Sequence, residues 1–166
     1  MPVNFTHGLE EAMNYLHKQG AFLTVKSEDK INTMTISWGN VGFEWNRPIF
    51  TVLVRKSRYT HDLIEAANEF TVSIPLSSNL KKELLFCGTK SGKDVDKIKE
   101  CSIALQDGVS VATPVISACD IHYECKIVYK QDMNPDLLKD TLKNSNYKDG
   151  DYHTIYYGEI VSCYKK

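Results

Sequence analysis

The 166-residue sequence has few of the features that mark a specialised class of protein. No apolar run approaches the ~20 residues of a transmembrane helix. The first residues, MPVNFTHGLEE, place two glutamates where a signal peptide would be apolar. Charge of one sign is not in excess, because 20 Lys and Arg face 21 Asp and Glu. We therefore expect a cytoplasmic protein without a nucleic-acid or membrane partner.

Cysteine and histidine occur without a recognisable metal or disulfide pattern. The five cysteines are odd in number and no two form a Cys-x-x-Cys pair, so reduced thiols are expected rather than a disulfide framework or a zinc site. No two histidines have the spacing of a helical metal motif. The sequence also lacks a Gly-x-Ser-x-Gly elbow, a Walker A loop and a dinucleotide-binding fingerprint.

The length and the ordinary composition, 42% hydrophobic and 25% charged, indicate one globular domain over residues 1–166. Runs rich in β-branched and aromatic residues predict about seven strands. These are Ala21–Lys26, Ile31–Trp38, Pro48–Arg55, Phe70–Ile74, Ile103–Leu105, Val115–Tyr129 and Thr154–Tyr164. Most of them follow one another without long helices between. This favours a mainly β fold, an antiparallel closed or nearly closed barrel, over a doubly wound parallel sheet.

Several peripheral helices are expected around this barrel. Thr6 is a natural N-cap for a first helix that ends at Gly20, and Thr60 is one for a second helix. A third helix is expected over Leu80–Phe86 with Gly88 past its end. Asn134, followed by Pro135, predicts the start of a short fourth helix.

The segment Asn32–Trp38 combines short polar side chains with methionine and tryptophan. A planar polar heterocycle requires that mixture, because small donors and acceptors satisfy ring heteroatoms while apolar walls exclude water. The same alternation is also what an ordinary amphipathic strand shows. Both interpretations stay open for this segment.

The segment Arg55–Ile64 places three cations, two hydroxyl side chains and a phenol before or at the start of a helix. Unpaired N–H groups at a helix N-terminus and arginine side chains both suit a phosphate group. A solvated basic turn in which Thr60 merely caps the helix is the alternative interpretation.

The segment Cys87–Lys97 is a polar loop punctuated by Gly88 and Gly92. Such a loop can fold over a bound ligand or simply connect two elements. Cys87 can be a reactive thiol near that ligand or a packed side chain, and packing is the favoured interpretation. His153 and Tyr157, which lie among several tyrosines, are further candidate pocket donors.

In this order the three segments resemble the flavin reductase-like family, whose domains are FMN-binding split β-barrels and include the flavoredoxins. Asn32–Trp38 looks like the family strand along the flavin ring, and Arg55–Thr60 looks like its phosphate-binding turn. Cys87–Lys97 is similar to the family's Gly-x-x-Ser-Gly-x-Asp-Val-Asp-Lys loop. The likeness covers most of the chain.

The resemblance implies a homodimer that binds FMN and reduces it with NADH or NADPH. It implies that the ring is bound by Asn32, Met34, Thr35, Ser37 and Trp38, the phosphate by Arg55, Ser57, Tyr59 and Thr60, and that Ser91, Gly92 and Lys93 complete the pocket. No catalytic acid or base is then required, because the flavin itself carries the redox chemistry. A flavoredoxin-like electron carrier with a redox-protein partner and a ligand-binding barrel without redox function are the alternatives.

Overall fold

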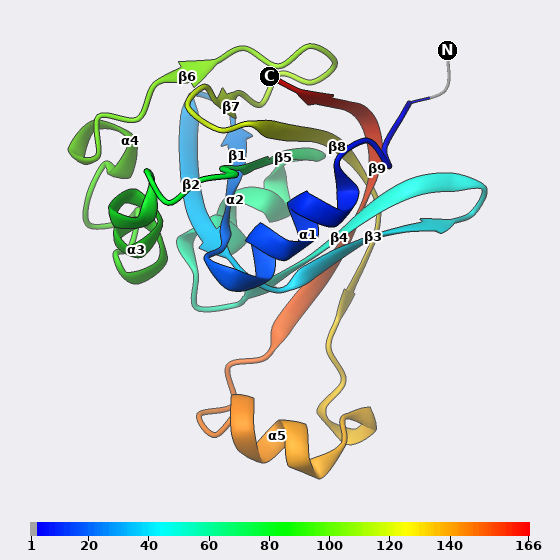
Figure 1. Cartoon of the computed structure of the whole chain (residues 1–166). Helices are drawn as coiled ribbons and strands as arrows, with labels where there is room; N and C mark the ends of the chain where they lie inside the picture. The colour runs from blue at the N-terminus through cyan, green and yellow to red at the C-terminus, as the bar shows by residue number, and fades with distance from the viewer. Residues whose placement is uncertain (1–2) are drawn as a thin grey trace.

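The computed structural model describes residues 3–166, and its main feature is a seven-stranded antiparallel sheet that curls on itself (Figure 1). The strands follow in the order β2 (Lys30–Ile36), β1 (Ala21–Ser27), β5 (Glu69–Ile74), β8 (Ile121–Asp132), β9 (His153–Lys165), β4 (Arg47–Arg55) and β3 (Gly39–Glu44). A separate two-stranded sheet contains β6 (Leu105–Gln106) and β7 (Val115–Ile116). The mainly β, antiparallel architecture expected from the sequence is confirmed.

The two edge strands of the large sheet, β2 and β3, are consecutive in the chain. Only Ser37 and Trp38 separate them, so the sheet must curl to bring its edges within the reach of this short link. Helix α1 (Leu9–Lys18) packs against this region, where His17 Nδ1 lies 3.2 Å from the Ser37 carbonyl oxygen. The result is a barrel with an unpaired seam between β2 and β3.

The hydrophobic core fills the curled sheet and continues under α1. It includes Leu16 of α1, Phe50 of β4 and Tyr123 of β8, all fully buried. A second, smaller cluster lies between β1 and α3 (Lys81–Thr89), where Phe22 contacts Leu84 and Cys87. The burial of apolar surface, worth ~25 cal/mol per Å², stabilises both hydrophobic clusters. This packing fixes α3 beside β2, next to the site described below.

Two further helices and one excursion complete the fold. Helix α2 (Tyr59–Ala66) follows β4, and the one-turn helix α4 (Lys97–Glu100) follows the loop after α3. Between β8 and β9 the chain leaves the barrel as an arm, residues 133–152, which contains the 3₁₀ turn η1 (Pro135–Leu137) and helix α5 (Asp140–Asn146). The arm projects away from the sheet at the bottom of Figure 1. No helix of residues 3–166 is long and apolar enough to cross a membrane.

Several local predictions are corrected by the structure. Gly8 and Arg58, not Thr6 and Thr60, occupy the N-cap positions of α1 and α2. The Thr6 hydroxyl instead donates to Asn4 Oδ1, and the Thr60 hydroxyl accepts from Asn32 Nδ2. Gly88 lies inside the last turn of α3 rather than beyond it.

Other strand boundaries also differ from the prediction. The expected strand over residues 115–129 is divided into β7 and β8, because the chain turns at Ser117–Asp120. The short strand expected over residues 103–105 is β6, shifted by about two residues. Strand β3 was not predicted. It pairs with β4 across Trp45 and Asn46, whose φ angles of 52° and 58° make a two-residue hairpin turn.

Candidate functional site

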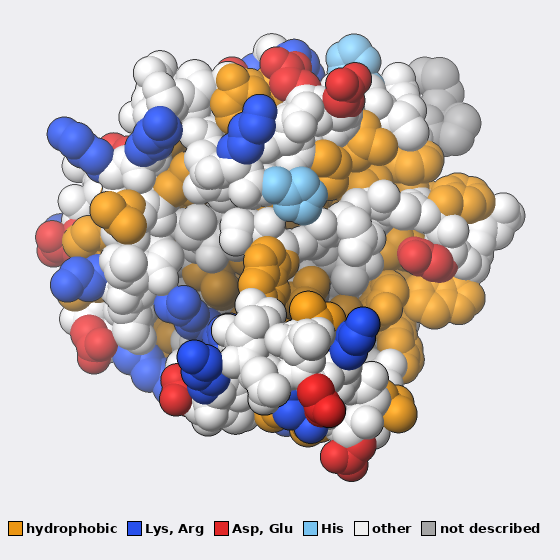
Figure 2. All heavy atoms as spheres, turned by 60° about the horizontal axis from the view of Figure 1, so that its bottom comes forward, with side chains coloured by type: hydrophobic (Ala, Val, Ile, Leu, Met, Phe, Trp, Pro, Cys, Tyr) orange, Lys and Arg blue, Asp and Glu red, His pale blue; other side chains and the backbone are white. Residues whose placement is uncertain are grey.

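Two adjoining hollows lie where β2, the end of β4, the start of α2 and the base of the arm meet. They have volumes of about 160 and 200 Å³ and share Met34, Arg55 and Arg58. The first hollow is also lined by Thr35, Ile36, Ser37, Trp38, Leu53 and His153. The second is also lined by Ser57, Tyr59, Thr60, Thr89, Lys90, Ser91, Gly92, Lys97 and Asp151. Figure 2 shows this end of the molecule, with hydrophobic side chains in a recess and Lys and Arg side chains beside it.

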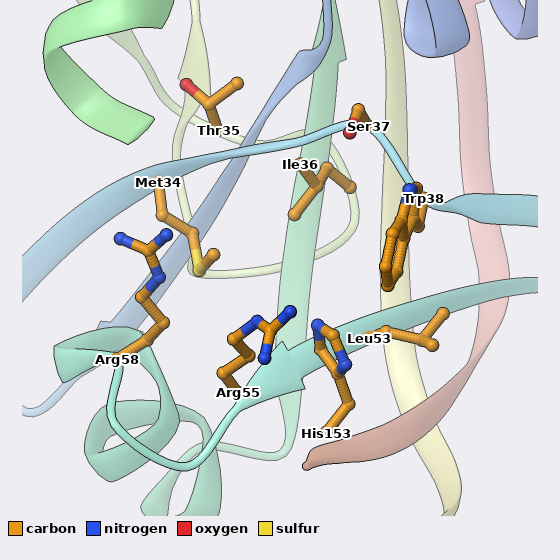
Figure 3. A pocket seen from close by; sticks show the side chains of 9 residues that line it. All are labelled: Met34, Thr35, Ile36, Ser37, Trp38, Leu53, Arg55, Arg58 and His153. Atoms are coloured by element: carbon orange, nitrogen blue, oxygen red, sulfur yellow. The ribbon is translucent and has the colours of Figure 1, made fainter. Parts of the chain in front are cut away.

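Strand alternation decides which side chains of the β2 segment enter the first hollow. Met34, Ile36 and Trp38 extend toward Arg58, Arg55 and His153, whereas Thr35 points to the opposite side of the strand (Figure 3). The Thr35 hydroxyl donates to the Leu84 carbonyl of α3 at 2.6 Å. The apolar members of the segment therefore form the wall, and Thr35 offers its backbone.

Trp38 and His153 form the far end of the first hollow, with ring centroids 5.4 Å apart. The Tyr147 hydroxyl lies 2.7 Å from His153 Nδ1 and stabilises the position of the imidazole. Burial and the positive charge of Arg55 lower the pKa of His153 to about 4. The imidazole is therefore neutral at pH 7 and presents Nε2 as a neutral polar group.

Arg55 and Ser57 connect the site to the arm. The Arg55 guanidinium donates to the carbonyl oxygens of Asp151 and Asn146 at 2.7 and 3.0 Å, and it lies 5.1 Å above the centre of the Tyr147 ring. Both the backbone N–H and the hydroxyl of Ser57 donate to the Asp151 carboxylate. These two expected phosphate ligands thus hold the base of the arm in this structure.

A buried hydrogen bond joins β2 to the start of α2. Asn32 is only 4% exposed and donates from Nδ2 to the Thr60 hydroxyl at 2.9 Å. Gly92 packs against Asn32 and Tyr59, because an added Cβ would clash with Asn32 Oδ1 and lie 2.7 Å from Cδ1 of Tyr59. The loop that carries Ser91 and Gly92 therefore needs glycine to approach the second hollow closely.

Lys93, also expected to complete the pocket, lies outside both hollows. Its ammonium pairs with the Asp62 carboxylate of α2 at 2.9 Å on an exposed surface. Its side chain also lies over the Tyr59 ring, 6.0 Å from the centroid. Lys93 thus attaches the loop to α2, while Asn32 lies behind the wall of the second hollow.

Sequence reasoning missed two cations of the second hollow. Arg58 donates from Nη1 to the Gly88 carbonyl at 2.9 Å. Lys97 is 3% exposed and donates from Nζ to the carbonyls of Cys87 and Thr33 at 2.9 and 3.0 Å. Both residues lie in segments that the sequence singled out, but charge alone does not tell which cation is buried. Asp151 also lines the second hollow, but it lies in the arm, outside the segments that the sequence singled out.

Cys87 is a packed side chain, as the favoured interpretation stated. It is fully buried, and burial raises the pKa of its thiol to about 12, so a reactive thiolate is disfavoured at pH 7. Tyr157 lines neither hollow; its ring packs 5.4 Å from Tyr129 and 5.7 Å from Trp45. Across residues 3–166, no group of three or more His, Cys, Asp or Glu is placed to hold a metal ion.

Comparison with known proteins places this architecture in a family. The model of the flavin reductase like domain matches residues 13–166. The chain belongs to the flavin reductase-like family. Its fold is the family's FMN-binding fold, and the resemblance seen in the three sequence segments is confirmed.

Several known proteins resemble this chain in sequence or in fold. A functionally uncharacterised protein of Archaeoglobus fulgidus is 30% identical over 149 residues, which are 90% of this chain and 73% of that protein. The crystal structure of flavoredoxin from Methanosarcina acetivorans is 26% identical with a TM-score of 0.70, covering 89% of this chain and 68% of that one. An FMN-binding protein from Thermus thermophilus, 22% identical with a TM-score of 0.69, shares the fold over 88% of this chain and 69% of its own.

The residues of the two hollows fit a flavin mononucleotide. Met34, Ile36 and Trp38 provide apolar surface of the kind that covers a planar ring. The second hollow contains Arg58, Lys97 and the start of α2, whose first N–H groups have no side-chain cap. Cations and free helix N–H groups are the usual partners of a phosphate.

Proposed function

We propose that this protein is an FMN-dependent NAD(P)H oxidoreductase of the flavin reductase type, which transfers a hydride from a nicotinamide nucleotide to the flavin. One observation carries the proposal: an apolar hollow walled by Trp38 adjoins a cationic hollow at the start of α2. An aromatic wall beside a phosphate-type environment matches a ring joined to a phosphate.

The chain's own residues bind and orient rather than react. Met34 and Trp38 wall the ring, with Asn32, Thr35 and Ser37 contributing through the backbone and structure of this segment. The phosphate end is the second hollow, which Tyr59 and Thr60 line together with Arg55 and Ser57, the two residues that also hold the arm. The loop carrying Ser91, Gly92 and Lys93 borders this end. The flavin, when bound, supplies the hydride-accepting chemistry.

The histidine of the first hollow is not a protonated general acid at pH 7. His153 is neutral because burial and Arg55 lower its pKa to about 4. Its role in the proposed reaction is to position the donor nucleotide and to exclude water together with Trp38. Holding two reactants in contact is itself a large rate effect, because it removes their translational freedom.

A second candidate function is that of an electron carrier, which binds FMN and exchanges electrons with a partner protein. The 26% identity to the flavoredoxin of Methanosarcina acetivorans favours it. Trp38, which walls the first hollow, is 43% exposed, so a bound ring would lie close to the surface. Such exposure suits electron transfer between proteins as well as access by a nucleotide.

We also propose that the protein is a homodimer. Exposed large apolar side chains occur at Phe43 of β3, at Trp45 in the turn after it, and at Val128 and Tyr129 of β8, and the rings of Trp45 and Tyr129 lie 5.9 Å apart. Apolar side chains gathered on one face are typical of an interface, and a second copy of this chain is the partner proposed. Light scattering after size exclusion should give twice the 18.9 kDa mass of the chain.

The test of function is an anaerobic absorption experiment. Purified protein is loaded with FMN, desalted and mixed rapidly with NADH or NADPH. Bleaching of retained flavin faster than that of free flavin supports the oxidoreductase and names its donor. Retained colour that only a redox protein bleaches favours the carrier, whereas absence of stoichiometric FMN binding contradicts both and leaves a barrel for another ligand.

A further inference from the structure

Two cysteines, Cys87 and Cys101, meet at the small hydrophobic cluster between β1 and α3. Cys87 lies in the last turns of α3 and is fully buried. Cys101 is the C-cap residue of α4, is half-buried and packs against the same cluster, which includes Phe22 and Leu84. A side-chain hydrogen bond joins the two thiols, with Cys87 as the donor. The two sulfur atoms are therefore direct neighbours.

Backbone contacts hold the two cysteines in this arrangement. The Cys101 N–H donates to the Lys97 carbonyl at 3.1 Å, and Lys97 Nζ in turn donates to the Cys87 carbonyl at 2.9 Å. Lys97 is almost completely buried, so this link between α4 and the end of α3 is shielded from water. Two thiols that share a hydrogen bond need only a further approach of their side chains to reach the ~2.0 Å of an S–S bond.

The surroundings keep both cysteines in the thiol form at pH 7. Burial raises the pKa of Cys87 to about 12 and also raises the pKa of Cys101. The negative charge of Glu83, one turn before Cys87 on α3, raises the pKa of both thiols further. Glu83 Oε2 is buried and has no hydrogen-bond partner among residues 3–166. Because the thiolate is the reactive form, the pair should react faster as the pH rises above 7.

We propose that Cys87 and Cys101 form a redox pair, which a small-molecule disulfide converts into an intramolecular disulfide. The half-buried Cys101 reacts first: its thiolate attacks one sulfur of the oxidant, whose S–S bond breaks and releases one thiol. Cys87 then attacks the Cys101 sulfur, which forms the Cys87–Cys101 bond and releases the second thiol. Two electrons pass from the protein to the oxidant, and the two protein thiol protons end on the two released thiols.

The cross-link would close residues 88–100 into a ring. This ring contains the loop with Ser91 and Gly92, which borders the second hollow, and the whole of α4 apart from its C-cap. A disulfide restricts the unfolded chain and so stabilises the folded one. The oxidised protein should therefore unfold at a higher temperature, and amide exchange in residues 88–100 should slow. Neither effect requires a bound flavin.

The experiment incubates the full chain with oxidised glutathione at pH 8.5 and counts free thiols by alkylation and mass spectrometry. The count should fall from five to three without glutathione remaining on the protein, and dithiothreitol should restore it. The Tm should rise by about 4–16 °C on oxidation. Glu83→Gln should react faster, because it removes a negative charge beside both thiols.

Three variants separate the steps of the reaction. Cys101→Ser should form no internal disulfide, and Cys87→Ala should stop at a stable mixed disulfide between Cys101 and glutathione. Cys163→Ser is the matched control, since Cys163 is also half-buried but lies on β9, and it should still lose two thiols.

Five free thiols after oxidation, a mixed disulfide that persists on the full chain, or an internal disulfide in Cys101→Ser would each overturn the inference. A chain that forms the disulfide but binds no FMN would instead contradict the proposed function alone.

Discussion

The Arg55 guanidinium donates to the backbone carbonyl of Asp151 over 2.7 Å, although the two residues are 96 positions apart. This bond joins the end of β4 to the base of the arm. Together with the bond to Asn146 and the contact with Tyr147, it gives the arm a defined attachment at the mouth of the site. The arm should therefore be sensitive to a change at this position.

Arg55→Ala is expected to lower the free energy of unfolding by about 1–3 kcal/mol, because it removes two charge-assisted bonds and leaves their carbonyls unpaired. Hydrogen exchange should accelerate in residues 140–152. Arg47→Ala is the control, since its ion pair with Glu159 is largely exposed and worth at most ~1 kcal/mol. Equal stability losses in both variants would show that Arg55 does not anchor the arm.

Trp38→Leu is expected to weaken FMN and riboflavin equally, by about three- to tenfold. The substitution removes an aromatic face worth about 0.5–1.5 kcal/mol and leaves the cations of the second hollow untouched. Quenching of flavin fluorescence measures both affinities. Trp45→Leu provides the control, because Trp45 is 57% exposed and lines neither hollow. A selective loss of FMN would indicate that Trp38 lies at the phosphate end.

Gly92→Ala is expected to impair flavin binding by at least tenfold, because the new methyl group would displace Tyr59, which lines the second hollow, or Asn32, which lies behind its wall. Calorimetry with FMN measures the effect. Gly42→Ala is the comparison: its Cβ would meet only the flexible side chain of Glu44 at 3.3 Å. Unchanged affinity in Gly92→Ala would mean that the loop lies away from the bound flavin.

Stability should fall between pH 7 and pH 5 through two buried histidines. Burial lowers the pKa of both His122 and His153 to about 4, below the 6.5 of an unfolded histidine. The unfolded chain therefore binds more protons in this range, and the free energy of unfolding rises with pH. Between pH 7 and pH 5, each histidine changes the free energy of unfolding by about 2 kcal/mol. This contribution to stability is fully present above pH 6.5 and is lost as the pH falls toward 4.

Urea unfolding at pH 7 and pH 5 checks this expectation. His153→Gln should reduce the difference between the two pH values, whereas His7→Gln should not, because His7 is exposed near the N-terminus. Carboxylates titrate alike in all three proteins, so their contribution cancels in the comparison. A pH dependence that His153→Gln leaves unchanged would mean that this imidazole is charged in the folded state.

The strands that bury apolar side chains could be predicted from the sequence, and the turns between them could not. Phe70–Ile74 alternates clearly and forms β5 almost as expected. Strand β3 was missed because Gly39 and Gly42 weaken its pattern and because Trp45–Asn46 is an unusual sequence for a hairpin with positive φ. Its pairing with β4 is decided by tertiary contacts rather than by local preference.

The candidate site was predictable where it is local in sequence. In the segment Asn32–Trp38 the sequence indicated Met34 and Trp38, which do line the first hollow. It did not indicate Ile36, which also lines that hollow, and it did not show that the Thr35 hydroxyl bonds to α3. The face of the strand that lines the site depends on how the sheet curls, and this curvature cannot be predicted from the sequence of the segment alone. Arg55 and Ser57 bond to Asp151 of the arm, which lies almost a hundred positions away in the sequence. No local sequence pattern can indicate such a contact.

The link of Ser37 and Trp38 across the seam couples ligand binding to the closure of the whole sheet. Trp38 walls the first hollow, and its backbone continues directly into the edge strand β3, while Ile36 ends the opposite edge, β2. A molecule packed on both Trp38 and Ile36 would contact the two edge strands, β3 and β2, at the same time. A bound ligand should therefore reduce the local opening of β2 and β3 together. The seam between these two strands would then be stabilised by the ligand that binds beside it.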